Sequence, residues 1–422
     1  MRKKILVRGP ALTRSGYGEQ SRFALRSLRT REDLFDIYLE PLSWGQTSWI
    51  VDDFEERRWL DHLIEKTVHY VHNGGQFDMS LQITIPNEWD RYAPVNVGYT
   101  AGIETTKISP HWIEKAELMD KIIVVSNHAK NIYNSTFYQA EHPETKEQVF
   151  MKNETEIEVV NYPVRLYEPA DIDIDFEYDF NFFVSAQWGP RKNVGNTIQW
   201  FVEEFHDDEV GLLLKLNLAK NCLMDREMCE AKIQQHLAAY PDRKCKIYLL
   251  HGHMNEQELS AVYNHPKVKA FLTLTHGEGY GLPIFEAAYY GVPVIAPDWS
   301  GQCDFLYAPS KKNKNKMRPH FAKVDYSLEI VPKDVVWEGV IQADSAWCAP
   351  HENSFKSRIR EVYKNYDRFK SQANNLKDYL IETFTEEGKY DEFATAVYGD
   401  DIPEPDINAW LENMSEMIEK HE

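Results

Sequence analysis

The second half of the chain alternates short apolar runs with longer helix-compatible stretches, and this rhythm limits the possible folds more than any other feature. The apolar runs read as buried strands over residues 182–186, 211–216, 246–250, 268–275 and 293–296, and the stretches between them as helices over 196–204, 225–239 and 256–263. Alternation of this kind predicts an α/β fold with a parallel, doubly wound sheet. Ligands of such sheets bind beyond the carboxyl ends of the strands, so the loops there are where a site is expected.

The first half reads as a similar, less regular unit. Strands are predicted at residues 3–7, 36–39, 81–85, 95–100, 121–126 and 156–160, with a helix after the first strand that runs to about residue 28. Proline and charge break the rhythm between residues 166 and 178, which predicts a domain boundary there. Two Rossmann-like domains are therefore expected, over residues 1–168 and 176–395, and the tail at about 405–422 is a candidate amphipathic helix.

Composition supports two folded domains and disfavours several kinds of partner. The 422 residues suffice for two domains of ordinary size, and a hydrophobic content of 43% indicates substantial cores. No apolar run reaches the ~18 residues that a membrane helix needs, and the start of the chain reads as a core strand and not as a signal peptide. The five cysteines form no Cys-x-x-Cys pair, which favours reduced thiols in a cytoplasmic setting. A formal charge of −20 disfavours nonspecific binding to nucleic acid or anionic lipid.

The most specific motif lies between Glu278 and Glu286, which seven residues separate. Glycines at 277, 279 and 281 precede Pro283, which reads as the first turn of a helix that follows a strand end. A helix N-terminus presents free backbone N–H groups and about half a positive charge, which suits a diphosphate. Two carboxylates beside that position would repel phosphate, so we interpret them as acceptors of hydrogen bonds from sugar hydroxyls. The segment therefore predicts a nucleotide-sugar site.

This segment closely resembles the E-x7-E signature of family 4 retaining glycosyltransferases, which have the GT-B fold of two Rossmann-like, doubly wound domains facing across a cleft. The match combines the glutamate spacing with Gly-Tyr-Gly-Leu-Pro after Glu278 and with the later Gly-Val-Pro-Val-Ile run. The resemblance implies a nucleoside-diphosphate sugar in the C-terminal domain and an acceptor that enters from the N-terminal domain. It also implies that the C-terminal helix packs back on the N-terminal domain.

The resemblance assigns roles to further residues. Arg191 and Lys192 would neutralise the departing diphosphate, although the usual spacing places the lysine a few residues beyond the arginine. Charge stabilisation of this type is worth about 3–4 kcal/mol per well-placed donor. Glu278 would bind hydroxyls of the donor sugar and Glu286 those of the ribose. The other residues expected to face the donor are Gly16, Tyr17, Lys215, His253, Gly279, Tyr280, Gly281 and Leu282.

The acceptor side of the predicted site departs from the family pattern. Glu104 resembles a glutamate that a subgroup of these enzymes has near the domain cleft, where it would bind an acceptor hydroxyl or support the anomeric centre. Many members instead have a histidine that touches the donor sugar, and His111 and His128 fit that position poorly. Asp304 stands where the family usually has a glutamate, so no role is assigned to it.

Three other patterns are interpreted as structural or solvent-exposed features without a role in binding or catalysis. His251 and His253 show i, i+2 spacing without an evident third ligand, which favours a structural role over a metal site. The Asp-x-Asp pattern at residues 171–175 falls in the predicted linker and reads as solvated. The run at 311–318 has five cations in eight residues and reads as a solvated loop, with a phosphate contact as the alternative. No metal site is predicted.

The predicted function is a metal-independent, retaining transfer of a sugar from a nucleotide sugar to a hydroxyl acceptor, with no obligatory cofactor. UDP- or GDP-sugars are the expected donors, and a glycan, a protein or a small molecule the expected acceptor. One alternative is a phage-type enzyme acting on hydroxymethylated bases of DNA in a host cytoplasm. Others are a catalytically idle protein that binds nucleotide sugar or scaffolds a partner, and a GT-B epimerase.

Overall fold

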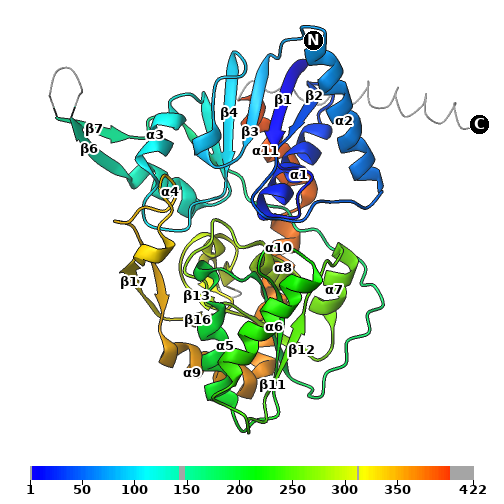
Figure 1. The fold of residues 1–422 in the computed structure, drawn as a ribbon, viewed down its shortest axis with the longest axis vertical. Helices are drawn as coiled ribbons and strands as arrows, with labels where there is room; N and C mark the ends of the chain where they lie inside the picture. The colour runs from blue at the N-terminus through cyan, green and yellow to red at the C-terminus, as the bar shows by residue number, and fades with distance from the viewer. Residues whose placement is uncertain (1, 142–147, 311–312, 400–422) are drawn as a thin grey trace, which may run out of the picture.

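The computed structural model, described for residues 2–141, 148–310 and 313–399, contains two six-stranded parallel sheets, one above the other in Figure 1. The N-terminal sheet has the order β2-β1-β3-β4-β5-β8, and the C-terminal sheet has the order β11-β10-β9-β12-β13-β16. In each sheet the chain starts at an inner strand and winds outward in both directions, which confirms the predicted doubly wound α/β architecture.

The elements of the N-terminal half follow the predicted alternation. Its sheet strands and helices are β1 (Lys3–Gly9), α1 (Gly16–Arg29), β2 (Phe35–Pro41), α2 (Glu55–His72), β3 (Met79–Ile83), β4 (Val95–Thr100), α3 (Pro110–Ala116), β5 (Lys121–Val124), α4 (Asn127–Ser135) and β8 (Ile157–Val159). An antiparallel ribbon of β6 (Phe137–Glu141) and β7 (Gln148–Lys152) projects from this half.

The C-terminal half repeats the pattern and adds two ribbons and three helices. Its sheet strands and helices are β9 (Asn181–Gln187), α5 (Val194–Phe205), β10 (Gly211–Asn217), α6 (Leu223–Leu237), β11 (Lys246–Leu250), α7 (Glu256–Asn264), β12 (Val268–Leu272), α8 (Leu282–Tyr289), β13 (Val294–Pro297) and β16 (Ala322–Val324). The ribbons are β14 (Tyr307–Ser310) with β15 (Asn313–Pro319), and β17 (Tyr326–Ile330) with β18 (Ala346–Pro350). The last helices are α9 (Glu352–Lys364), α10 (Tyr366–Thr383) and α11 (Glu386–Tyr398).

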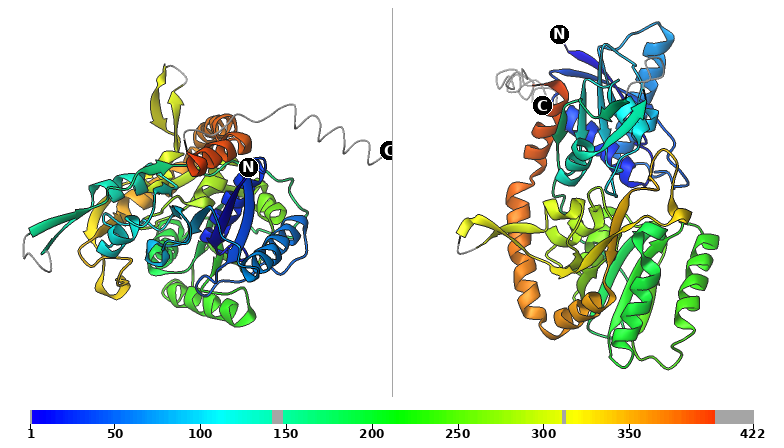
Figure 2. Two further views of the ribbon diagram at one scale, coloured as in Figure 1. Left: turned by 90° about the horizontal axis from the view of Figure 1, so that it is seen from above. Right: turned by 90° about the vertical axis from the view of Figure 1, so that its left-hand side faces the viewer.

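Two predictions need correction. The strand expected over 268–275 ends at Leu272, because the chain turns there into the loop that carries Glu278. The cationic run at 311–318 is not a loop in its described part, since residues 313–319 form β15 and Arg318 pairs with Ala308 on β14. The ribbon projects from the molecule in Figure 2, and residues 316–318 of β15 are exposed, so β15 needs no apolar alternation.

The chain returns to the N-terminal half through its last described helix. Figure 2 shows α10 and α11 along one side of both halves. Phe393 of α11 packs against Phe23 of α1 (ring centroids 5.2 Å apart) and against Tyr99 of β4 (4.9 Å). The helix predicted at 405–422 lies outside the described residues, and the division of the chain into domains at 168 and 176 stays a prediction.

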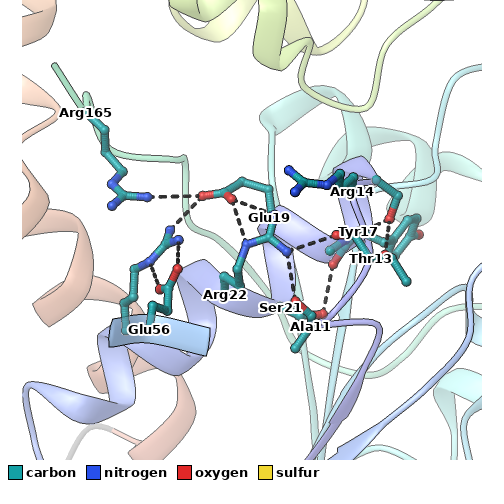
Figure 3. A network of polar contacts seen from close by, with 12 residues as sticks. Ala11, Thr13, Arg14, Tyr17, Glu19, Ser21, Arg22, Glu56 and Arg165 are labelled. Carbon is teal, nitrogen blue, oxygen red and sulfur yellow. Dashed lines mark hydrogen bonds and ion pairs between the residues drawn. The ribbon is translucent and has the colours of Figure 1, made fainter. Parts of the chain in front are cut away.

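A charged network fixes the segment between the two sheets to α1 (Figure 3). Glu19, in the first turn of α1, pairs with Arg22 (3.0 Å), Arg26 (2.7 Å) and Arg165 of the connecting segment (3.5 Å). Arg26 also pairs with Glu56 on α2. Burial alone would raise the pKa of Glu19, but the surrounding guanidinium groups lower it well below its usual range.

The segment 331–345 between β17 and β18, called the strap below, rises from the C-terminal half to the N-terminal half (Figure 2, right). Among the described residues, no helix is both long and apolar enough to cross a membrane. The five cysteines all have free thiols.

Candidate functional site

Arg191 and Lys192 lie on a single 3-10 turn just beyond the carboxyl end of β9. Asn193 follows with left-handed backbone (φ +53°) and starts α5. The carbonyl of Arg191 accepts a hydrogen bond from the backbone N–H of His276 (2.8 Å), which fixes the turn against the loop after β12. Both cations are thereby held beside Glu278.

The four residues predicted to be catalytic form one cluster. Lys192 Nζ lies 2.6 Å from Glu278 Oε1, and Arg191 Nη1 lies 3.0 Å from Glu278 Oε2. The same guanidinium reaches the N-terminal half, where its Nη2 lies 2.9 Å from Glu104 Oε1. It also donates to the carbonyl of Gly277 (2.6 Å). The side chain of Glu278 is only 8% exposed, so these ion pairs are shielded from water.

The cluster balances two cations against two carboxylates. Burial alone would raise the pKa of Glu278, but Lys192 and Arg191 outweigh burial and lower it to about 2. Burial raises the pKa of Glu104, and Arg191 offsets this effect only in part. Glu278 is therefore firmly ionised at neutral pH, whereas Glu104 is the carboxylate that gains a proton more readily.

The glycines before α8 allow the two halves to touch main chain to main chain. A Cβ atom at Gly277 would lie 2.1 Å from the carbonyl oxygen of Glu104, and one at Gly279 would lie 1.7 Å from that of Ala101. Ser126, just beyond β5, donates a hydrogen bond to the carbonyl of Gly279 (2.7 Å). Glycine at 277 and 279 is thus required by the contact between the carboxyl-end loops of the two sheets.

Glu286 lies in the second turn of α8, which begins after Gly281 in left-handed backbone (φ +97°). The hydroxyl of Tyr263 donates to Glu286 Oε2 (2.9 Å). Burial raises the pKa of Glu286 to about 7, and burial lowers that of Lys215 at the end of β10. The charges of Glu286 and Lys215 influence each other, so the two predicted residues face a common region.

Tyr280 and Leu282 lie on either side of Gly281 but differ in surroundings. The Tyr280 side chain is 3% exposed and packs against Tyr162 (ring centroids 5.0 Å apart) and Phe305 (4.9 Å). Leu282 is partly buried against the same core. Only the backbone of Tyr280 is therefore available to a ligand at the start of α8.

His253 meets a residue that no sequence pattern indicated. Arg14, in the loop after β1, contacts His253 Nε2 across the two halves and also pairs with Asp52. Burial, together with the charge of Arg14, lowers the pKa of His253, so its neutral ring can accept from the guanidinium. Arg14 is close in sequence to Gly16 and Tyr17, which were expected to face the donor, but its partners come from distant segments.

Gly16 and Tyr17 differ in what they offer to a ligand. Gly16 starts α1 with no atom within 4 Å of the position that a Cβ would take. The Tyr17 hydroxyl instead lies 2.8 Å from Thr100 Oγ1 and accepts from the backbone N–H of Ala101 (3.3 Å), while burial raises its pKa to about 12. Figure 3 shows Tyr17 beside Thr13 and Arg14. Tyr17 therefore supports the end of β4.

His251 has the neighbours that the sequence did not reveal. Asp225, Cys229 and His251 have potential metal-ligand atoms within 4.8 Å of one another. Among the described residues, they form the group whose spacing could hold a metal ion. Asp225 already accepts from His251 (2.8 Å) and from three backbone N–H groups at residues 218–220. These bonds use both carboxylate oxygens, so the group supports the loops after β10 and β11.

Asp304 and His128, left without roles by the sequence, lie where α4 meets the loop after β13. Asp304 accepts from the backbone and side chain of Asn127 (2.8 and 3.0 Å) and from Asn161 (3.1 Å). His128 packs edge-on against Trp299 (ring centroids 5.0 Å apart), and burial lowers its pKa to about 4. The contacts of Asn127 with Asp304 and of His128 with Trp299 therefore join the two halves at a second place, in addition to the charged cluster.

Comparison with known proteins gives one family match and many structural matches. Residues 225–393 match the model of the family described as "Family 4 Glycosyltransferase in conflict systems". No curated protein sequence matches the chain.

Three solved structures illustrate the fold. Sucrose-phosphate synthase from Thermosynechococcus elongatus has a TM-score of 0.59 at 10% identity, over 94% of this chain and 98% of its own. A glycosyltransferase from Rickettsia africae has a TM-score of 0.55 at 11% identity, over 95% and 100%. HepE from Anabaena, solved in complex with UDP-glucose, has a TM-score of 0.54 at 12% identity, over 94% and 100%.

At these identities the structural matches show the fold alone, and the family match covers residues 225–393, less than half of the chain. In this chain two parallel six-stranded sheets meet at their carboxyl-end loops. The family match covers α8 with Glu278 and Glu286. Residues 225–393 are therefore similar to family 4 glycosyltransferases, and the chain as a whole has the GT-B fold.

Proposed function

We propose that the protein transfers a sugar from a nucleoside-diphosphate sugar to a hydroxyl acceptor with retention of the anomeric configuration. The observation that carries the proposal is the cluster of Arg191, Lys192, Glu278 and Glu104, which joins donor-side cations to a carboxylate from each half of the molecule. A diphosphate would take over Arg191 and Lys192, because two phosphate charges compete effectively with a single carboxylate.

Most of the remaining contacts to the donor would come from α8 and from the loop before it. Release of Glu278 from its cations leaves both its oxygens free to accept hydrogen bonds from hydroxyls of the donor sugar. Backbone N–H groups of residues 279–282 at the start of α8 would hold the diphosphate, supported by the positive end of the helix. Glu286, already bonded to Tyr263, would accept from the ribose hydroxyls. Lys215, His253 and the open backbone at Gly16 would border the nucleotide.

The transfer step needs no group beyond these. The bond between the anomeric carbon and the phosphate oxygen breaks, and its electron pair goes to the nucleoside diphosphate, which Arg191 and Lys192 stabilise. The acceptor hydroxyl attacks the same face and passes its proton to the departing phosphate oxygen. Because two side-chain cations supply the positive charge, the proposed reaction requires no divalent ion. Glu104 would bind the acceptor hydroxyl or support the charge developing at the anomeric carbon.

UDP-sugars are the first donors to test, since a protein of the same fold, HepE from Anabaena, was solved with UDP-glucose. The acceptor that we favour is a glycan, a protein or a small molecule. One observation favours a DNA acceptor as the second candidate, because Lys316 and Arg318 are exposed on the projecting ribbon of β14 and β15. The net charge of −20 opposes that candidate.

The proposal is tested by following release of nucleoside diphosphate from UDP- and GDP-sugars in EDTA, with and without candidate acceptors. The wild type is expected to release nucleotide slowly by hydrolysis and faster with a true acceptor. Arg191→Ala should reduce the rate by about 10²–10³, the typical loss when one stabilising donor is removed. The control is Arg226→Ala, which removes an exposed guanidinium on α6.

The outcomes separate the remaining alternatives. A wild type that binds donor but never releases nucleotide would be an idle binding protein. Conversion of the donor sugar without nucleotide release would indicate an epimerase. Equal rates for the wild type and Arg191→Ala would refute the proposed role of the cluster.

A further inference from the structure

The strand β18 contacts the loop that carries Glu278. The backbone N–H of Cys348 donates to the carbonyl of His276 (2.9 Å), and His276 Nδ1 contacts the Cys348 carbonyl in return. The indole of Trp347 stacks on the imidazole of His276, with ring centroids 4.3 Å apart and an interplanar angle of 11°. Trp347 is 4% exposed. Because His276 is two residues from Glu278, these contacts hold in place the loop that carries the Glu278 carboxylate.

The same strand contacts the loop that carries Glu104. The backbone N–H of Thr106 donates to the carbonyl of Ala346 (2.9 Å), and the backbone N–H of Ala346 donates to Thr106 Oγ1 (2.8 Å). Thr106 follows Glu104 by two residues and belongs to the other half of the molecule. Ala346 and Trp347 are neighbours, so a single strand sets the distance between the two carboxylate loops.

The strap reinforces this connection. Its Asp344 pairs with Lys107 (2.5 Å), and the carbonyl of Gly339 accepts from Asn87 (3.2 Å). Val340 packs against the apolar cluster beneath α3. The outer side of the strap is different, since Trp337 is 58% exposed. The strap therefore contacts the N-terminal half at Lys107, at Asn87 and at this apolar cluster.

We infer that β18 positions the reacting groups, with Trp347 and Thr106 as positioning residues that hold Glu278 and Glu104 on opposite sides of Arg191. Both carboxylates approach the guanidinium closely, at 3.0 and 2.9 Å, so a small shift of either loop breaks the arrangement. A displacement of about 1 Å at a reacting centre can reduce a rate by about 10². The inference rests on the proposed function for its chemistry, whereas the coupling of the two loops is a property of the fold.

Thr106→Val tests the link with little change in volume. It removes the hydroxyl and leaves the half-buried backbone N–H of Ala346 without its acceptor. We expect kcat to fall 10- to 100-fold and the Kd for the donor to change less than threefold, because no donor contact is removed. Thr106→Ser, which retains the hydroxyl, should restore kcat to within threefold of the wild type.

Trp347→Ala tests the other end of the strand, and Trp337→Ala is its matched control on the exposed side of the strap. Trp347→Ala should reproduce the split between kcat and Kd, and Trp337→Ala should leave both unchanged. A loss of kcat that tracks an equal loss of donor affinity, or full activity in both Thr106→Val and Trp347→Ala, would overturn the inference.

Hydrogen exchange measured by mass spectrometry supplies a readout that needs no activity. Trp347→Ala lies in the C-terminal half, yet it should speed exchange of residues 101–107 in the N-terminal half. Thr106→Val should likewise speed exchange of residues 276–279. Changes confined to the half that carries the substitution would refute the coupling. Failure of the wild type to use any nucleotide sugar would refute the proposed function, and the exchange experiment would still decide whether β18 links the loops.

Discussion

Glu286 shows how burial prepares a single carboxylate for a ligand. Its pKa is about 7, because burial raises it from a usual value of 4.5 and the Tyr263 hydroxyl opposes this effect only in part. In the free protein the folded state therefore holds a proton that the unfolded state has released between about pH 4.5 and 7. Its contribution to the free energy of unfolding is present below pH 4.5 and is lost as the pH rises through 7.

Binding of ribose hydroxyls requires the ionised form, so donor affinity should depend on pH. About a tenth of Glu286 is ionised at pH 6 and about nine-tenths at pH 8, and the apparent Kd varies inversely with that fraction. We expect the Kd for UDP-glucose to increase about tenfold from pH 8 to pH 6, measured by calorimetry. UDP-glucose is suitable because its diphosphate has no group that titrates in this range.

The control for this prediction is Glu286→Gln. The variant should bind the donor more weakly at pH 8 and should lose the pH dependence between 6 and 8. An unchanged pH profile in Glu286→Gln would assign the titration to another group, such as His253, and would contradict the role of Glu286.

The loop before α8 is the element in which the close packing of the backbone most clearly requires glycine. Gly279 faces the carbonyl of Ala101 so closely that a Cβ atom would lie 1.7 Å from that oxygen. Gly189, in the loop after β9, has no atom within 4 Å of the position that its Cβ would take. The two glycines therefore form a matched pair for testing the contact between the halves.

Gly279→Ala should force the two loops apart and prevent the halves from meeting, while each sheet stays folded. We expect activity to fall more than 100-fold and the radius of gyration, measured by small-angle X-ray scattering with donor, to exceed that of the wild type. Gly189→Ala should match the wild type in both measurements. Wild-type activity in Gly279→Ala would show that the contact of 279 with 101 is not part of the working state.

The elements that the sequence predicted are those with a buried face. Strands of both sheets contain buried apolar residues, as in β1, where Ile5 and Val7 are fully buried. Helix α2 escaped prediction because its apolar stripe is narrow, with Leu60, Leu63 and Thr67 its buried residues. The ribbons were not predicted, because β15 is rich in cations and the pair of β17 and β18 lies outside the regular alternation of strands and helices.

The candidate site was predicted to the extent that one local motif determines it. The spacing of Glu278 and Glu286, read with the cations at 191 and 192, indicated the donor side. Arg14 and β18 could not be predicted, since their partners are distant in sequence and only tertiary packing brings them together. Tyr280 was expected to face the donor because it lies in the motif, yet its side chain faces the core. Its position in the motif gave no indication of this.

At the scale of the whole molecule, several contacts between the halves lie around the proposed donor site. Arg14 meets His253, Glu104 meets Arg191, and Ala346 of β18 meets Thr106. The first two contacts join loops at the carboxyl ends of both sheets, where doubly wound folds bind ligands. A donor bound there would touch both halves at once, and its binding would therefore stabilise the folded protein as a whole.

The most direct measurement is thermal unfolding in EDTA with UDP-, GDP-, ADP- and TDP-sugars, for the wild type and for Glu286→Ala. A ligand that binds only the folded state adds about 2.7 kcal/mol at a concentration a hundredfold above its Kd. We expect one nucleotide sugar to stabilise the wild type without metal and to leave Glu286→Ala unchanged. No stabilisation by any of these sugars, or equal stabilisation of both proteins, would refute the proposed donor site.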